Sequence, residues 1–401
     1  MALAHLAGAA AGGARAARGA HAQRRSGAQS RARAHRPAAA GLLPALRGGN
    51  HRERRGHSVR LSVERRSLRL AQPLRSSYGS VGERELLAVS ITDDAGASGH
   101  GEAAPLPAYD GVSLERVARA LERYRRVLAG SGKLADAQVI QACRDADALP
   151  AALAAIDLAL WDRAGRLRGM PVAALLHHSP ASEVPVNATI AALDRAAAAE
   201  QAAAAVREGF DCVKLKVGIE GDAARVAAVR AAAGAGVALR VDANGAWNVE
   251  QAVAAIETLA PAGLELVEEP VHGLAHIREL KERVAVRLAI DETAAQSGAL
   301  GAGAADAVCL KISRCGGISG LLAAAAVVRA SGAELYVAST LDGPIGTAAA
   351  LHAAAALAAE GPLPHCGLAT LRLFTGIENQ LPARGGRIAV PSAPGLGVDP
   401  L

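Results

Sequence analysis

From about residue 184 onward, short β-rich runs alternate with Ala-rich helical stretches, and this rhythm constrains the fold more than any other feature. The β-rich runs begin at about Val184, Cys212, Ala238, Leu264, Arg287, Ala307, Glu334 and Pro364. The helical patterns between them include residues 196–208, 221–234, 249–260 and 317–331. Strands that alternate with helices form parallel βαβ units, and eight such strands suit a closed barrel. The sequence therefore predicts an α/β fold with a (β/α)-barrel at residues 181–368.

A doubly wound open sheet is the competing architecture for this pattern. Such a sheet would carry a Gly-rich dinucleotide loop after its first strand. Gly301-Ala-Gly303 lacks the third glycine and does not lie at that position, which favours the barrel.

Two further regions flank the predicted barrel. Residues 59–180 start with alternating segments that are typical of antiparallel strands, so we expect an α+β domain there. Its helical patterns cover residues 113–130, 136–146 and 149–166. We expect residues 369–401 to form a C-terminal segment that packs back toward this domain.

The first 58 residues differ in composition from the rest. They contain 11 Arg and one acid, Glu53, so they carry a charge of +10 and leave residues 59–401 with a net charge of −4. We interpret residues 1–58 as a disordered extension, with an organellar transit peptide as the alternative. The mildly acidic remainder disfavours a nucleic-acid surface.

The composition also bears on localisation. No apolar run rich in large aliphatic residues is long enough to span a membrane. The five cysteines contain no C-x-x-C pair, and an odd number does not suit a disulfide framework. We therefore expect a cytoplasmic protein.

Two lysines lie on the second predicted barrel strand, in Val213-Lys214-Leu215-Lys216-Val217. Side chains two residues apart on a strand share a face, so both lysines point the same way. If the apolar face packs against helices, the lysines point into the barrel near its C-terminal mouth, where barrel enzymes carry their active sites. Solvated lysines on an edge strand are the alternative.

The next three predicted strands end in acidic residues. These are Asp242, then Glu268 and Glu269, then Asp291 and Glu292. Any one of them could simply mark a strand that meets a helix N-cap. Three on consecutive strands would converge in a barrel, where carboxylates repel each other unless a cation lies between them. An all-oxygen set without His or Cys selects Mg²⁺ or Mn²⁺ and not zinc.

Lys311 ends the sixth predicted strand, across the barrel from Lys214 and Lys216. A metal flanked by lysines suits the removal of a proton next to a substrate carboxylate. The metal neutralises charge on the carboxylate, one lysine takes the proton, and the opposite lysine protonates the other face or stabilises the intermediate. A barrel with a decayed site that only binds a ligand is the non-enzyme alternative.

The motifs K-x-K, D-x-N, E-E-P, D-E-T and K on strands two to six resemble the muconate-lactonizing subgroup of the enolase superfamily, in the mandelate racemase/muconate lactonizing branch. The resemblance extends from about Val59 to the C-terminus and includes the segments at 101–109 and 154–162. It implies a modified TIM (β/α)-barrel with an N-terminal α+β capping domain. It also implies a lyase or isomerase that uses Mg²⁺ and a metal-stabilised enediolate.

The resemblance assigns roles to the basic residues and to the cap. Lys216 would be the principal acid/base, with Lys311 as its opposite partner. Lys214 would tune Lys216 or contact the substrate carboxylate. The loops that contain Tyr78 and Tyr109 would close over the substrate and exclude water.

The resemblance also assigns roles to the acids. The implied metal ligands are Asp242, Glu268 and Asp291. Asn244 would be a hydrogen-bond donor beside them. Glu269 and Glu292 would either support these ligands or serve as ordinary ion-pair partners.

Specificity is expected to depend on strands seven and eight. Strand seven ends in Ser339, Thr340 and Asp342, before a helix whose free N–H groups could hold a distal anion; capping of that helix is the alternative role. Strand eight contributes Cys366 and Gly367 and contains no acid, whereas dipeptide epimerases usually place Asp-x-Asp there.

The activity is expected to be the dehydration carried out by o-succinylbenzoate synthases of the menaquinone pathway, which the residues at 366–370 resemble. Residues 342–347 resemble muconate cycloisomerases instead, and N-acylamino-acid racemase and dipeptide epimerase are further alternatives. We expect a small-molecule carboxylate substrate, no nucleic-acid or membrane partner, and a homo-oligomer formed through outer barrel helices.

Overall fold

The structure is a computed structural model that describes residues 59–76, 78–132 and 135–400. The extension predicted at residues 1–58 lies outside the described residues. Three antiparallel strands open the described chain: β1 (Val59–Ser76), β2 (Gly79–Asp93) and β3 (Ser98–Ala103). β1 and β2 form one long hairpin, which closes next to Tyr78 where Ser76 pairs with Gly79.

Five helices follow this sheet. They are α1 (Pro107–Asp110), α2 (Leu114–Ala129), α3 (Asp136–Ala146), α4 (Pro150–Arg168) and α5 (Val172–Leu176). Helix α4 packs closely on β3, because β3 has glycines where the helix approaches. A Cβ at Gly101 would lie 1.9 Å from the carbonyl oxygen of Ala155, and one at Gly99 would lie 2.0 Å from that of Ala159. No residue larger than glycine fits at these two positions.

Seven parallel strands form the barrel sheet, in the spatial order β11-β10-β9-β8-β7-β6-β5. They are β5 (Ala188–Ile190), β6 (Cys212–Lys216), β7 (Ala238–Asp242), β8 (Leu266–Glu268), β9 (Leu288–Ile290), β10 (Ala307–Lys311) and β11 (Glu334–Ala338). Cys366 bridges to Val186 and Gly367 bridges to Ala338, so this segment connects the two edges of the sheet. The predicted modified TIM barrel is confirmed, with its eighth strand position reduced to two bridges.

Two of the eight predicted strands differ from the structure. The run at Val184 forms β4 (Glu183–Pro185), which pairs with β13 (Arg387–Ala389), and the first barrel strand begins at Ala188. The run at Pro364 forms no regular strand. Proline donates no backbone hydrogen bond and is poorly suited to the middle of a sheet.

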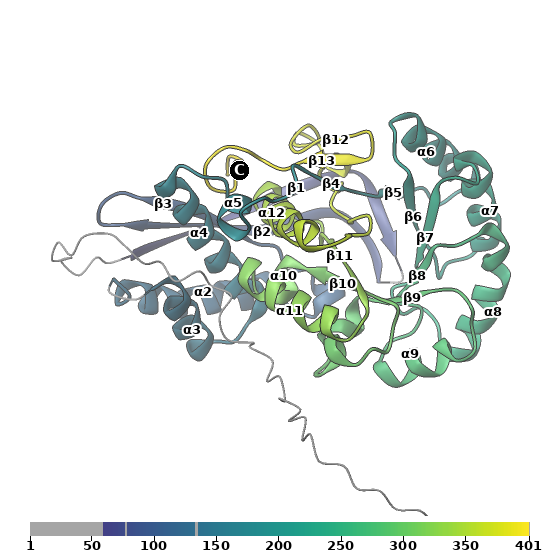
Figure 1. Ribbon diagram of the computed structural model, residues 1–401, viewed down its shortest axis with the longest axis horizontal. Helices are drawn as coiled ribbons and strands as arrows, with labels where there is room; N and C mark the ends of the chain where they lie inside the picture. The colour runs from purple at the N-terminus through teal and green to yellow at the C-terminus, as the bar shows by residue number, and fades with distance from the viewer. Residues whose placement is uncertain (1–58, 77, 133–134, 401) are drawn as a thin grey trace, which may run out of the picture. The chain divides into compact units, whose positions relative to one another are not determined.

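Helices connect the barrel strands, and Figure 1 shows α6 to α9 on the outer side of β6 to β9. The longer helices are α6 (Arg195–Arg207), α7 (Asp222–Ala233), α8 (Val249–Leu259), α9 (Leu274–Lys281), α11 (Ile318–Ala330) and α12 (Pro344–Glu360); α10 (Ile312–Cys315) and the 3-10 turn η1 (Ala260–Ala262) are short. Between β9 and β10 the described chain has no α-helix. Two 3-10 turns, η2 (Glu292–Ala295) and η3 (Ala299–Gly301), replace it.

The C-terminal residues return to the hairpin of the first region. They contain η4 (Leu371–Leu373), β12 (Ala383–Arg384) and β13. Phe374 forms an antiparallel bridge with Leu70, and the amide of Thr375 donates to the carbonyl oxygen of Arg69 at 2.9 Å. None of the described helices combines the length and apolarity that a membrane crossing requires.

Candidate active site

The two lysines of β6 reach into the barrel, whereas the alternating residues Val213 and Leu215 are fully buried in the core. The Nζ atom of Lys214 lies 2.7 Å from both carboxylate oxygens of Glu268 and 2.8 Å from Oδ2 of Asp242. Lys216 donates to the same Oδ2 of Asp242 at 2.6 Å. One ammonium group therefore connects the carboxylates of two neighbouring strands.

The three predicted metal ligands lie at the carboxyl ends of consecutive strands. Asp242 ends β7 and pairs in register with Glu268, which ends β8, while Asp291 directly follows β9. All three are at most 4% exposed. Glu268 also accepts a hydrogen bond from the hydroxyl of Tyr336 at 2.7 Å. Tyr336, on β11, is a site contact that the sequence analysis did not identify.

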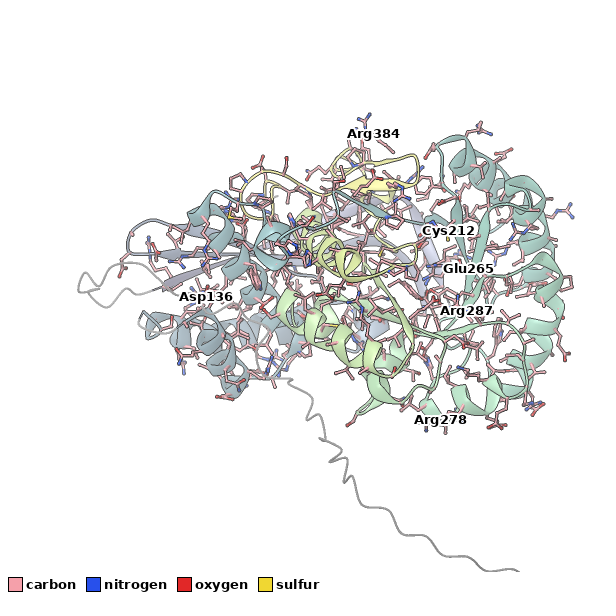
Figure 2. The ribbon with its side chains drawn as sticks, in the orientation of Figure 1. Asp136, Cys212, Glu265, Arg278, Arg287 and Arg384 are labelled. Carbon is pink, nitrogen blue, oxygen red and sulfur yellow. The ribbon has the colours of Figure 1, made fainter. Side chains whose placement is uncertain are left out.

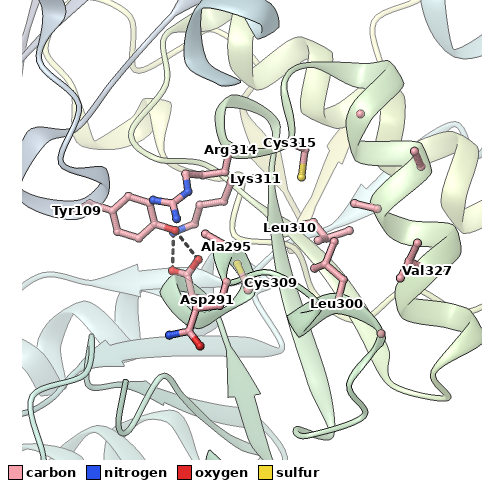
Figure 3. Close-up of a pocket in the computed structure, with 17 residues that line it drawn as sticks. Tyr109, Asp291, Ala295, Leu300, Cys309, Leu310, Lys311, Arg314, Cys315 and Val327 are labelled. Carbon is pink, nitrogen blue, oxygen red and sulfur yellow. Dashed lines mark hydrogen bonds and ion pairs between the residues drawn. The ribbon is translucent and has the colours of Figure 1, made fainter. Parts of the chain in front are cut away.

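Lys311 lies on the opposite side of the site, on β10. Its Nζ donates to Oδ2 of Asp291 at 2.5 Å, and Tyr109 donates to the other oxygen at 2.7 Å, as Figure 3 shows. The ammonium of Lys311 and the guanidinium of Arg314 lie 4.1 Å and 5.0 Å from the centre of the Tyr109 ring. These residues form the inner end of a cavity of about 600 Å³ that extends toward α11, beside the turns η2 and η3.

Glu269 fixes the chain around Asp291. Its Oε2 accepts from the amide of Asp291 at 2.8 Å, and its Oε1 accepts from the amide of Thr293 at 3.0 Å and from the Thr293 hydroxyl at 2.5 Å. Glu269 and Asn244 have φ angles of 38° and 47°, a left-handed backbone that costs on the order of 1 kcal/mol for residues other than glycine. Strain of this kind is typical of functional sites.

Glu292 joins the capping domain to the barrel mouth. Its Oε1 accepts from the hydroxyl of Tyr78 at 2.8 Å and from the amide of Asn244 at 3.0 Å. The side-chain oxygen Oδ1 of Asn244 accepts from Nζ of Lys216 at 2.7 Å. Burial, together with the charges of Asp291 and Asp242, raises the pKa of Glu292 to about 7.

The charges of the cluster offset one another. Burial by itself lowers the pKa of Lys214, but the adjacent Asp242 and Glu268 raise it above its ordinary value. The pKa of Lys311 is raised in the same way, mainly by Asp291. Burial opposes ionisation of Asp242, yet the two β6 lysines hold its pKa well below the usual range. The ionised forms of Lys214 and Asp242 therefore stabilise one another.

The donor set fits a hard divalent cation. Carboxylate oxygens from Asp242, Glu268 and Asp291 are the ligands that Mg²⁺ and Mn²⁺ prefer. Cys309 places its sulfur within 4.8 Å of oxygens of Glu268 and Asp291. Burial raises the pKa of the Cys309 thiol and so disfavours the thiolate form that ligates metals.

A cavity of about 110 Å³ adjoins the lysines, and several of the predicted site residues line it. Its lining includes Tyr78, Tyr109, Ser339, Thr340 and Gly367. Asp342 and Cys366 are not among its lining residues.

Both of these residues have partners elsewhere. Asp342 accepts hydrogen bonds from the hydroxyls of Ser339 and Thr340, at 3.0 and 2.8 Å. Cys366 is fully buried and its thiol donates to the carbonyl oxygen of Pro364 at 3.7 Å.

The N-terminus of α12 was expected to offer free amides to a distal anion. Instead, Glu102 of β3 accepts from the amide of Gly343 at 2.6 Å and from that of Gly346. Arg84 of β2 donates to the carbonyl oxygens of Thr340 and Leu341 in the same loop. The capping domain thus occupies two of the amides at this helix N-terminus, so these two are not free for a substrate anion as was expected.

Sequence analysis missed several neutral polar residues of the cavity wall. Asn187, Thr189 and Thr370 line the cavity. Thr189 on β5 pairs with Lys214 on β6, and Asn187, two residues earlier, directly precedes β5. The pattern N-x-T could have revealed them if the first barrel strand had been placed at Ala188 and not at Val184.

Two family models match this chain. Residues 58–177 match the model described as the mandelate racemase / muconate lactonizing enzyme N-terminal domain. Residues 197–401 match the model described as enolase C-terminal domain-like. Together they cover the hairpin domain and most of the barrel.

Characterised relatives share this architecture and differ in activity. The L-Ala-D/L-Glu epimerase of Bacillus subtilis (strain 168) is 31% identical over 358 residues, which cover 85% of this chain and 96% of the relative. The o-succinylbenzoate synthase of Thermobifida fusca (strain YX) is 39% identical over 201 residues, which cover 48% of this chain and 61% of the relative. A dipeptide epimerase from Enterococcus faecalis V583, crystallised with Mg and the dipeptide L-Leu-L-Tyr, is 27% identical and superposes with a TM-score of 0.77 over 85% of this chain and 99% of that one.

Proposed function

The chain belongs to the mandelate racemase/muconate lactonizing enzyme family of the enolase superfamily, and on that premise we propose that it is a Mg²⁺-dependent o-succinylbenzoate synthase. The reaction would remove water from a hydroxycyclohexadiene carboxylate that carries a succinyl chain. Asp242, Glu268 and Asp291 would hold the Mg²⁺, which supplies positive charge to the substrate carboxylate when bound.

Lys216 would be the residue that carries out the proton transfer. In its uncharged form, Lys216 Nζ takes the proton from the carbon next to the carboxylate. The electron pair of that C–H bond forms a ring double bond while the neighbouring C–O bond breaks. The leaving hydroxyl takes the proton that Lys216 has just accepted and departs as water, which returns Lys216 to its uncharged form. Lys311, held by Asp291 on the opposite wall, contributes a fixed positive charge.

The observation that carries this choice is the charge of the cavity wall. Among the described residues that line the cavity next to the lysines, Asp242 is the only acid, and it is bonded to Lys214 and Lys216. The free ammonium of a dipeptide would lack a carboxylate partner there, and burial of an unpaired charge is costly. A substrate with carboxylates and neutral oxygens fits this wall better.

Turnover assays of the 401-residue chain with Mg²⁺ test the proposal, by ultraviolet absorbance for the first two substrates below and by optical rotation for the last two. The four substrates are the succinyl hydroxycyclohexadiene carboxylate, muconate, an N-succinyl amino acid and a dipeptide. We expect kcat/KM for the first to exceed the others by about a hundredfold or more. A higher kcat/KM for muconate or the dipeptide would reject the synthase assignment but keep the general chemistry. No Mg²⁺-dependent turnover of any substrate would reject both.

N-acylamino-acid racemisation is the second candidate, because Lys216 and Lys311 lie on β6 and β10, on opposite walls of the site. Two bases on opposite faces of one carbon permit removal of a proton from one face and return to the other. Incorporation of solvent deuterium into an N-succinyl amino acid, followed by NMR, would reveal this activity. Retention of the α-proton over many hours would exclude it.

A further inference from the structure

Two buried polar side chains in the cavity wall have no hydrogen-bond partner among the residues that the structure describes. They are Asn187, which is 2% exposed, and Thr370, which is 7% exposed. Both the nitrogen and the oxygen of the Asn187 amide are without a partner, and so is the hydroxyl of Thr370. Buried polar groups in native proteins are almost always paired, so these atoms require an explanation.

The backbone holds Asn187 firmly in place. Its amide N–H donates to the carbonyl oxygen of Cys366 at 3.0 Å, next to the bridge between Val186 and Cys366. Gly367, which also lines the cavity, lies next to the side chain. A Cβ at that position would press to 2.9 Å from the Cβ of Ala338 and would lie 3.7 Å from Oδ1 of Asn187. Asn187 is therefore a fixed, unpaired polar group in the wall of the cavity.

The chemistry of the amide restricts what it can bind. Asn187 offers two N–H donors and a carbonyl acceptor, and Thr370 offers a hydroxyl that donates or accepts. A carboxylate only accepts hydrogen bonds, so it would leave the side-chain oxygen of Asn187 without a donor and would repel it electrostatically. A neutral group that combines a carbonyl oxygen with a nearby hydroxyl or N–H would satisfy both atoms.

We propose that Asn187 and Thr370 form the specificity-determining contact of this site, and that they bind a neutral carbonyl group of the substrate that has a hydroxyl or an N–H beside it. This inference rests on the proposed function, because it places the substrate carboxylate at the lysine end of the same cavity. Two sources fit the chemistry. One is the ketone and ring hydroxyl of the synthase substrate, and the other is the amide of an N-succinyl amino acid.

The test compares Asn187→Leu and Thr370→Val with Thr347→Val. The control suits this purpose because the Thr347 hydroxyl on α12 is also fully buried and has no partner in the described part of the chain, but Thr347 does not line the cavity. KM, kcat and the melting temperature are measured with Mg²⁺ for each variant. We expect KM to rise roughly ten- to hundredfold in both cavity variants, with a smaller change in kcat. The melting temperature should stay equal or rise, because no internal hydrogen bond is lost.

The possible outcomes separate the inference from the proposed function. If the synthase substrate is turned over and KM is unchanged in both cavity variants, the inference is wrong and the synthase proposal stands. If only the N-succinyl amino acid is turned over and its KM rises in the variants, the inference stands and the synthase proposal falls. An equal rise of KM in Thr347→Val would show a general packing effect and overturn the inference. The absence of turnover with every substrate would also overturn the inference.

Discussion

Each predicted metal ligand is already paired with an ammonium group. Lys214 contacts Asp242 and Glu268, and Lys311 contacts Asp291. These pairs offset the cost of burying three carboxylates side by side. Lys216 differs from Lys214 because it contacts a single carboxylate and the amide oxygen of Asn244. Loss of Lys216 should therefore change the positions of Asp242, Glu268 and Asp291 less than loss of Lys214 or Lys311.

We expect Lys216→Ala to lower kcat by about a thousandfold, because the general base is lost. Circular dichroism and calorimetric titration with Mg²⁺ should give results like those of the unmodified chain. Lys281→Ala is the matched control, since Lys281 pairs with Asp306 on the surface at 2.9 Å. Activity close to that of the control would remove Lys216 from the role of base.

The ring of Tyr336 lies 5.1 Å from the guanidinium of Arg240, and its hydroxyl donates a hydrogen bond to Glu268. Loss of a group that orients a ligand typically weakens metal affinity by about tenfold or more. We expect that loss for Tyr336→Phe in a titration of activity against Mg²⁺. Tyr124→Phe, which removes a buried hydroxyl bonded to the carbonyl oxygen of Asp147 outside the barrel, should leave the Mg²⁺ dependence unchanged. Equal behaviour of the two variants would contradict an orienting role.

The residues that sequence could reveal share one property. A charged side chain at the end of an apolar strand, such as Lys311 or Asp242, is costly to bury and is therefore conspicuous in the pattern. Asn187, Thr370 and Tyr336 carry no charge, and residues of these types occur at many solvent-exposed or core positions. Their place in the site depends on strand register and on contacts between distant segments, which local periodicity does not encode.

At the scale of elements, the contact of Glu102 with the N-terminus of α12 connects the capping domain to the barrel. Burial and the nearby Asp342 raise the pKa of Glu102 to about 8. In the unfolded chain this carboxyl would ionise near its ordinary pKa of about 4.3. Its contribution to stability is therefore fully present below about pH 4.3 and is lost as the pH rises through about 8.

We expect the free energy of unfolding to fall with rising pH across this window, by up to about 1.4 kcal/mol per pH unit from this group. Glu102→Gln should flatten that slope, because a glutamine oxygen can still accept from Gly343 and Gly346 but does not ionise. Urea unfolding at several pH values between about 5 and 8 measures the slope. A slope that is equal in both proteins would show that Glu102 is already ionised in the native state.

Helices were easier to predict than strands in this chain. The long Ala-rich patterns correspond to α6, α7, α8 and α11 to within one or two residues. The first barrel strand was misplaced because Val184, Val186, Ala188 and Ile190 alternate without interruption, although the pairing partner changes within the run. Alternation reports which face is buried, but it does not report which strand lies alongside.

At the scale of the whole chain, the site needs both the cap and the barrel. Tyr78 and Tyr109 come from the first region and bond to Glu292 and Asp291, which follow β9. Sequence patterns placed the barrel residues on strand ends. The two tyrosines were reached only through the family resemblance, because their contacts span 182 residues or more.

Three different strands contribute the acidic side chains of the predicted metal site. These side chains come from β7, β8 and the end of β9, so an ion that binds all three ties these strands together only in the folded state. Binding to the folded state alone raises the free energy of unfolding by about 2.7 kcal/mol when free Mg²⁺ is a hundredfold above its dissociation constant. The melting temperature should therefore be higher in Mg²⁺ than in EDTA.

Glu268→Gln should abolish this shift, because it removes one ligand from the middle strand of the three. Glu265→Gln is the matched control. Glu265 precedes β8 at the opposite end of the sheet, where it accepts from Arg240 at 2.8 Å and from Cys212 at 3.8 Å, and Figure 2 shows it beside Cys212. The control should lose stability through its broken ion pair but keep the full Mg²⁺ shift. If the shift survives in Glu268→Gln, or is missing from the unmodified chain, the ion does not bind at these three carboxylates, and the proposed proton abstraction loses its metal.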